Sequence, residues 1–263
     1  MTAIADLFAQ TKSENRAALV GYLPAGFPDK ATSIAAIDAM IDGGVDLVEV
    51  GLPYSDPVMD GPVIQAAAGQ ALAAGTRVKD VFDVVRAAAA RVPTVVMTYW
   101  NPVERYGVDR FAADLAGAGG AGLITPDLIP DEAAEWLAAS TAHQLDRIFL
   151  VAPSSTDDRL AMTAKASSGF LYATAVMGVT GARETTSSMA PELVARVRAV
   201  SDISVGVGLG VSSGVQAAEV AAYADAVIVG SALVRCLGAG VEPDVGVAAV
   251  RALAEELRAG VQR

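Results

Sequence analysis

Short apolar runs rich in β-branched residues alternate along this chain with longer, alanine-rich amphipathic stretches. The apolar runs predict strands at Ala18–Tyr22, Leu47–Gly51, Thr94–Tyr99, Gly122–Ile124, Arg147–Val151, Phe170–Ala175, Ile203–Val207 and Ala226–Val229. These runs are apolar throughout, which is typical of a parallel sheet covered on both faces. The stretches between them predict helices at Lys30–Asp42, Val63–Ala74, Val78–Ala90, Arg110–Ala118, Asp131–Ala142, Asp157–Ser167, Pro191–Val200, Val215–Ala224 and Asp244–Ala259.

The number and spacing of these units predict the fold class. Eight strand–helix units in about 250 residues fit a (β/α)8 TIM barrel, and a doubly wound open sheet is the alternative. Met1–Gln10 predicts an additional helix before the first strand, which could close the bottom of the barrel. No linker or low-complexity tract interrupts residues 1–263, so we expect a single barrel domain.

Composition and charge narrow the class of protein. The formal net charge is −11, which disfavours nucleic acids and anionic membranes as partners. Cys236 is the one cysteine, so no intrachain disulfide can form. The N-terminal residues lack the pattern of a secretory signal, and no run of about 18 apolar residues occurs. We therefore expect a cytoplasmic protein.

The stretch Val48–Gln65 carries the strongest chemical signal. Glu49 lies in an apolar strand, where burying a charge is costly. A turn rich in glycine and proline follows, and Asp60 precedes Gly61-Pro62 at the start of a predicted helix. A strand-end acid and a second acid on the next loop could meet across a cleft, which predicts a two-carboxylate acid/base site. The alternative is an acid that caps a loop or pairs with an arginine.

Glycine-rich loops late in the chain predict a phosphate site. Gly206–Gly210 follows the seventh strand, and Gly230-Ser231 follows the eighth and precedes the short stretch Ala232–Cys236. Glycine lets backbone N–H groups approach an anion, and barrels often bind phosphate at this place. Gly178–Gly181, after the sixth strand, could close over the ligand. The alternative is that these glycines serve only turns.

Several kinds of chemistry are disfavoured by what the chain lacks. His143, the one histidine, ends a predicted helix. One histidine and one cysteine cannot build the usual transition-metal sites. For the same reason, a Ser–His or Cys–His nucleophile pair is disfavoured. No lysine falls at the C-terminal end of a predicted strand, which disfavours a Schiff-base aldolase; the lysines are Lys12, Lys30, Lys79 and Lys165. We therefore expect no metal, and a chemistry of carboxylates, tyrosines and backbone amides on a phosphorylated substrate.

The run Glu49–Gln65 strongly resembles the signature of the tryptophan synthase alpha chain family. The resemblance continues along the chain at Tyr22–Pro28, Met97–Pro102, Pro126–Leu128, Gly178–Gly181 and Gly230-Ser231. It implies a lyase on a (β/α)8 barrel, which cleaves indole-3-glycerol phosphate to indole and glyceraldehyde 3-phosphate in the last steps of L-tryptophan biosynthesis.

The resemblance also implies roles for individual residues. Glu49 matches the proton-transfer acid of the family, and Asp60 matches the carboxylate that engages the indole N–H. Tyr172 falls where the family has a tyrosine near the glutamate, and with Tyr22 it is assigned to substrate binding. The positions that would hold the phosphate are Gly181, Gly210, Gly230 and Ser231. Val176, Met177 and Leu209 depart from the family pattern and could reshape the pocket or the closing loop.

A partner is implied in the same way. The indole would pass to a beta chain that carries pyridoxal phosphate, in an alpha2–beta2 tetramer, and this chain itself would carry no cofactor. Asp56 and Pro57, at the tip of the first loop, are the candidates for contact with that partner. Three alternatives stay open: a barrel isomerase or epimerase acting on sugar phosphates, a catalytically silent barrel that activates the beta chain, and a lyase that releases indole without a partner.

Overall fold

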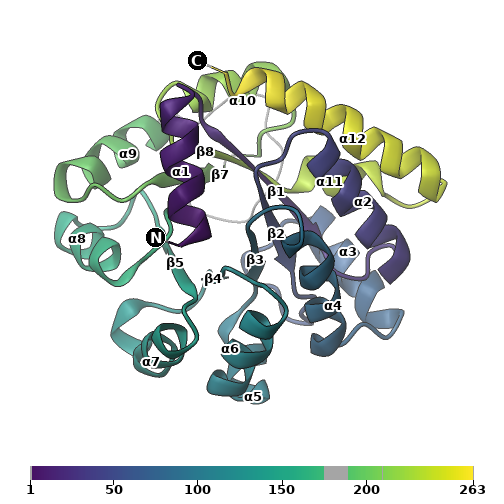
Figure 1. The fold of residues 1–263 in the computed structure, drawn as a ribbon, viewed down its shortest axis with the longest axis horizontal. Helices are drawn as coiled ribbons and strands as arrows, with labels where there is room; N and C mark the ends of the chain where they lie inside the picture. The colour runs from purple at the N-terminus through teal and green to yellow at the C-terminus, as the bar shows by residue number, and fades with distance from the viewer. Residues whose placement is uncertain (1, 175–188, 209, 263) are drawn as a thin grey trace.

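The structure is a computed structural model that describes residues 2–174, 189–208 and 210–262. Its strands form a closed, parallel barrel in the order of the chain (Figure 1). They are β1 (Ala18–Pro24), β2 (Leu47–Gly51), β3 (Thr94–Met97), β4 (Gly122–Thr125), β5 (Asp146–Val151), β6 (Leu171–Thr174), β7 (Val205–Gly208) and β8 (Ala226–Val229). Pairing of β1 with β8, with Ala18 opposite Ala226, closes the barrel and rules out the open sheet.

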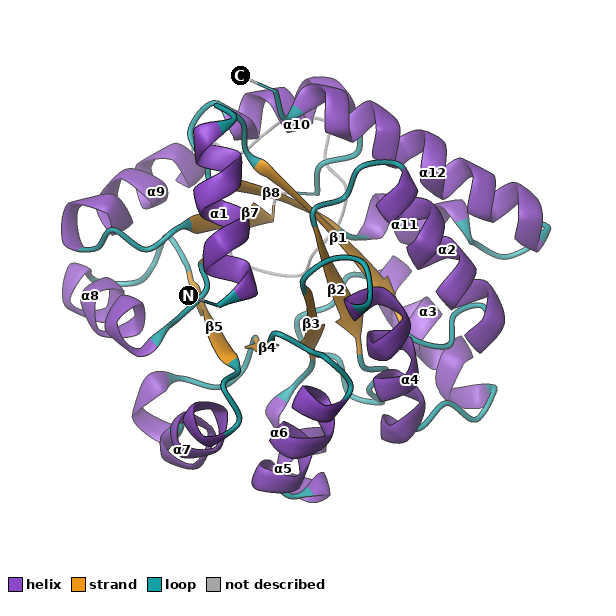
Figure 2. Ribbon diagram, viewed as in Figure 1, coloured by secondary structure: helices purple, strands orange, loops and turns teal. Residues whose placement is uncertain are grey.

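Helices surround the barrel, and the first of them lies across one of its ends (Figure 2). They are α1 (Ala3–Ser13), α2 (Lys30–Asp42), α3 (Pro62–Ala73), α4 (Val78–Ala89), α5 (Trp100–Tyr106), α6 (Val108–Gly117), η1 (Pro130–Glu132), α7 (Ala134–Ala142), α8 (Asp157–Ala166), α9 (Met189–Val200), α10 (Gly214–Ala221), α11 (Ser231–Cys236) and α12 (Pro243–Gly260). No helix in the described part of the chain is long and apolar enough to cross a membrane.

The additional N-terminal helix is confirmed, although it runs a few residues later than predicted. It begins after Thr2, whose hydroxyl accepts a hydrogen bond from the Ala5 N–H and caps it. Its apolar face, with Ile4 and Phe8, joins the cluster of side chains that fills the barrel interior. The Phe8 and Phe170 rings lie 5.7 Å apart between centroids. Helix α1 therefore covers the barrel end where the strands begin, which Figure 1 shows facing the viewer.

Two elements differ from the predictions. The strand expected over Thr94–Tyr99 ends at Met97, and Tyr99 precedes α5, which the sequence analysis did not predict. The first turn of α5 is capped from another loop, because Asp127 Oδ1 accepts the Trp100 N–H at 2.9 Å. The helix expected over Asp131–Ala142 is divided at Ala133 into η1 and α7. The Ala133 N–H bonds to the Pro130 carbonyl, which tightens the first turn into a 3-10 helix.

Candidate active site

Glu49 is held inside the barrel by its strand. It lies on β2, opposite Tyr22 of β1 and Val95 of β3. Its side chain is 1% exposed, and Oε1 has no hydrogen-bond partner among the described residues. Burial without a compensating partner disfavours the ionised form and raises the pKa of Glu49 to about 8. This carboxyl group therefore holds its proton at neutral pH.

Asp60 lies on the loop that connects β2 to α3 and is half-buried. Burial raises its pKa to about 6, and the Tyr99 hydroxyl, acting on the carboxylate as a hydrogen-bond donor, offsets part of the rise. Asp60 is consequently ionised in the pH range where Glu49 remains protonated. Two carboxyl groups with different charges at one pH are what an acid/base site requires.

Tyr22 and Tyr172 enter the same region from β1 and β6. Both side chains have pKa values raised above the usual range, first by burial and then by the negative charges of Asp60 and Glu49. Both carboxyl groups therefore act on both hydroxyls. The structure thus brings together four residues that are distant in the sequence: Glu49, Asp60, Tyr22 and Tyr172.

Two strand glycines make room for these tyrosines. A Cβ atom at Gly51 would overlap the Tyr22 hydroxyl, and one at Gly208 would overlap the Tyr172 hydroxyl. Gly51 is the last residue of β2, beside β1, and Gly208 lies on β7 beside β6. These glycines are therefore part of the site because the absence of a side chain leaves room for the two phenol groups next to the backbone.

Sequence reasoning missed Tyr99. The residue is 5% exposed and follows β3, at the same end of the barrel as Glu49. Its hydroxyl accepts the Met59 N–H at 2.9 Å, and its ring lies 5.3 Å from that of Tyr54. The signal that could have identified it is its place at the end of a predicted strand, where barrels carry their chemical groups.

The glycine-rich loops meet at the ends of β7 and β8, which are paired with Gly208 opposite Ile228. Gly210 has φ +71°, a conformation that favours glycine. Gly230 caps α11, and Ser231, 8% exposed, is its first residue. A Cβ atom at Gly230 would lie 3.4 Å from the Tyr22 ring, so this loop adjoins the carboxylate pair. Gly181, Val176, Met177 and Leu209 lie outside the described residues.

A cavity of about 320 Å³ lies between the ends of β4 and β5 and the start of α8. Its walls include Pro126, Leu128 and Leu150, and Leu150 is paired with Tyr172 across the two strands. Serine, threonine and arginine side chains line the rest of it, so the cavity is of mixed polarity.

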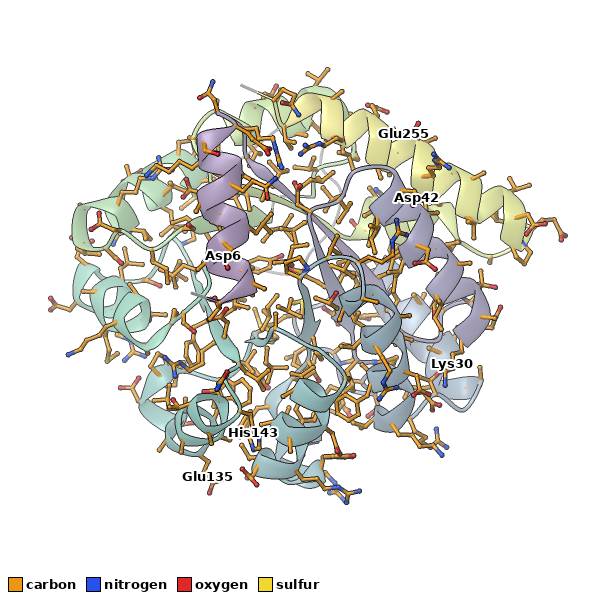
Figure 3. All side chains as sticks on the ribbon, in the orientation of Figure 1. Asp6, Lys30, Asp42, Glu135, His143 and Glu255 are labelled. Carbon is orange, nitrogen blue, oxygen red and sulfur yellow. The ribbon has the colours of Figure 1, made fainter. Side chains whose placement is uncertain are left out.

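Other residues considered in the sequence lie away from these groups. His143 is bonded through Nε2 to Asp109 Oδ1 at 3.0 Å, and Figure 3 shows it at the outer edge of the helix ring near Glu135. The four lysines all lie on the outer helices α1, α2, α4 and α8. Asp56 is exposed and Pro57 is partly exposed on the loop after β2, beside Val58, which is 76% exposed.

Comparison with known proteins gives a consistent result. The family model of the tryptophan synthase alpha chain matches residues 8–262. The chain is 64% identical over 260 residues to a tryptophan synthase alpha chain of Nocardia farcinica, covering 98% of this chain and 96% of the relative. A corresponding protein of Acidothermus cellulolyticus is 62% identical over 265 residues, covering 100% and 98%. A solved structure of Mycobacterium tuberculosis tryptophan synthase superposes with a TM-score of 0.94 at 59% identity, covering 100% of this chain and 99% of that chain.

Proposed function

Because the chain belongs to the tryptophan synthase alpha chain family, we propose that it cleaves indole-3-glycerol phosphate to indole and glyceraldehyde 3-phosphate. The observation that carries this proposal is the pair of buried carboxyl groups. Burial raises the pKa of Glu49 to about 8 and that of Asp60 to about 6. Near pH 7 the site therefore holds one proton donor and one carboxylate.

The first step uses Glu49 as an acid. Its proton passes to C3 of the indole ring, and the ring becomes a cation whose charge is spread to the N–H group. The ionised Asp60 accepts a hydrogen bond from that N–H and stabilises the charge. An apolar, water-poor setting strengthens this interaction, because the local dielectric constant is low.

The second step uses the Glu49 carboxylate as a base. It takes the proton from the hydroxyl on the carbon attached to C3, the carbon–carbon bond breaks, and its electron pair returns to the ring. Indole and the aldehyde are the products, and Glu49 regains its proton. One carboxyl group can serve both steps because its pKa lies close to the working pH.

The surrounding residues are assigned to binding. Tyr22 and Tyr172 would line the indole side of the pocket, next to both carboxyl groups. Gly210, Gly230 and Ser231 would hold the phosphate through backbone N–H groups and a hydroxyl, and Gly181 is assigned to the same set from the sequence. The four lysines lie on α1, α2, α4 and α8 and not on the loops after β7 and β8, which supports an anion site made of backbone groups.

A beta chain is the partner that the family implies, and an alpha2–beta2 tetramer is the assembly we propose. Pyridoxal phosphate would belong to the beta chain. The exposed tip of the loop after β2, with Asp56 and Pro57, lies at the end of the barrel where the site opens. Docking there would bring the partner beside the point where indole is released.

Replacing the two carboxyl groups tests the proposal. Glu49→Gln keeps the shape of the side chain and removes its proton transfer, so the release of indole from indole-3-glycerol phosphate should fall by roughly 10²–10⁴-fold. Asp60→Asn should also reduce turnover strongly. Glu135→Gln, which removes an exposed carboxylate on α7, is the matched control and should behave as the parent. A Glu49→Gln variant that is folded and retains the parent rate would refute the assignment, and a parent with no turnover would favour the silent barrel.

A further inference from the structure

The loop that carries Asp60 is tied to the next strand–helix connection by one phenol group. The Tyr99 hydroxyl accepts the N–H of Met59, the residue before Asp60, at 2.9 Å, and as a hydrogen-bond donor it lowers the pKa of the Asp60 carboxyl group. On the other side of the loop, Gln65 of α3 donates its amide N–H to the Asp60 carbonyl at 2.8 Å. The backbone around Asp60 is therefore held from both sides, while Ser55 and Asp56 at the loop tip remain exposed.

Tyr99 is itself held by neighbouring groups. The Tyr54 ring lies 5.3 Å from the Tyr99 ring between centroids, and the Asn101 amide donates to the Tyr54 hydroxyl at 2.9 Å. The start of α5, directly after Tyr99, is capped by Asp127. The Tyr99 ring is thus enclosed between its own rigid turn and the loop it supports.

The hydrogen-bonding capacity of a phenol determines which bonds the Tyr99 hydroxyl donates and which it accepts. A tyrosine hydroxyl can donate one hydrogen bond and accept others. Because the Tyr99 oxygen accepts the Met59 N–H, its single hydrogen is available to the Asp60 carboxylate. We infer that Tyr99 is a positioning residue, which orients the Asp60 carboxylate and favours its ionised form, and that Tyr54 and Asn101 hold Tyr99 in place for this purpose.

This inference rests on the proposed function, since it assigns a role within the same site. The titratable groups that act on or near Asp60 are Tyr22, Tyr172, Glu49 and Tyr99, with Asp127 acting on Tyr99. None of these groups is cationic. Among them, the Asp60 carboxylate can therefore be stabilised only by a hydrogen-bond donor, and Tyr99 is such a donor.

The pH dependence of kcat/KM separates positioning from a merely structural role. In the parent we expect kcat/KM to fall at low pH as Asp60 becomes protonated (the acidic limb) and at high pH as Glu49 loses its proton (the alkaline limb). Tyr99→Phe should move the acidic limb upward by about one pH unit, leave the alkaline limb in place, and lower kcat/KM near pH 6 by about fivefold. Tyr106→Phe, which removes a hydroxyl bonded to Asp114 on the outer helices, is the matched control and should leave both limbs unchanged.

A double-mutant cycle locates the effect. In an Asp60→Asn background the carboxylate is gone, so Tyr99→Phe should cost little further activity. Equal losses in both backgrounds, or an unchanged acidic limb in folded Tyr99→Phe, would overturn the inference. Two further variants, Tyr54→Phe and Asn101→Ala, weaken only the support of Tyr99. Each should shift the acidic limb in the same direction but by less. They provide a second test of the inference if Tyr99→Phe does not fold.

The inference can also be tested without turnover. Carbon-13 NMR titration of the Asp60 side chain in the parent and in Tyr99→Phe measures the pKa directly, and a rise in the variant is expected. A parent that titrates normally at Asp60 but releases no indole would defeat the proposed function alone. An Asp60 pKa that is equal in the two proteins would defeat the positioning role alone.

Discussion

Glu49 and Asp60 both carry a carboxyl group, but the two groups lie in different surroundings. Glu49 is fully enclosed in the barrel, without a hydrogen-bond partner for Oε1 among the described residues, whereas Asp60 lies on a loop beside a phenol donor. Their pKa values of about 8 and about 6 follow from this difference. The proposed roles, proton transfer for Glu49 and charge stabilisation for Asp60, therefore depend on environment rather than on residue type.

The proton held by Glu49 has a consequence for stability. In the unfolded chain its pKa is 4.5, and in the folded protein it is about 8. Below pH 4.5 both states are protonated and the folded state carries no penalty. As pH rises towards 8 the unfolded chain loses the proton first, so the free energy of unfolding falls, by roughly 3 kcal/mol at pH 7 from this group alone.

Glu49→Gln should remove this loss. We expect the variant to be more stable than the parent at pH 7 to 8, with the difference shrinking as pH is lowered to about 4.5. Urea unfolding of both proteins across that range measures it, and subtracting the parent curve removes the contributions of all other groups. A stability difference that does not change with pH would show that Glu49 titrates as it does in the unfolded chain.

At the scale of elements, the loops after β7 and β8 present glycines of two different kinds. Gly210 has φ +71°, so any side chain there strains the backbone before a ligand is considered. Gly230 has φ −120°, and a Cβ atom there would make an ordinary 3.4 Å contact with the Tyr22 ring. Gly230 is consequently the better position at which to test phosphate binding.

Gly230→Val should weaken binding of glycerol phosphate at least tenfold, because the added side chain would occupy the space through which the anion reaches the backbone. Isothermal titration calorimetry with glycerol phosphate measures the affinity. Gly117→Val is the matched control, since Gly117 is exposed at the end of α6 and a Cβ atom there meets nothing within 4 Å. Undiminished affinity in Gly230→Val would move the phosphate site elsewhere.

At the scale of the whole molecule, the two ends of the barrel serve different purposes. Helix α1 closes one end with apolar side chains. Near the beginnings of β1 and β2, Arg16, Asp46 and Arg258 of α12 form a cluster, with Arg16 to Asp46 at 2.7 Å and Arg258 to Asp46 at 3.2 Å. The opposite end holds the carboxyl pair and the loops, so a partner can reach the site without disturbing these contacts.

Docking of a beta chain should act through the exposed loop tip. Pro57→Glu places a charge beside the exposed Val58, and it should lower the activation by the beta chain more than it lowers the basal rate of the isolated chain. Indole release measured with and without the partner gives both rates. Hydrogen exchange in residues 53–60 should slow when the partner is added. Equal losses of basal and activated rates would mean that the tip serves the chemistry and not the docking.

The sequence by itself determined the order of the eight strands, most of the helices between them and the positions of the two carboxyl groups. The bounds of β2 and β8 match the predictions because both are continuous apolar runs ended by glycine. Glu49 could be identified because an acid inside such a run is costly without a purpose. These features depend on residues that are neighbours in the chain.

Only the tertiary structure decided how those groups behave. Helix α5 begins with a cap from Asp127, which lies 27 positions away, and the support of Asp60 by Tyr99 joins residues about 40 positions apart. No local pattern contains such contacts. The pKa values of Glu49 and Asp60 likewise depend on what surrounds each carboxyl group after the barrel closes, because desolvation is a property of the packed interior and not of the residue.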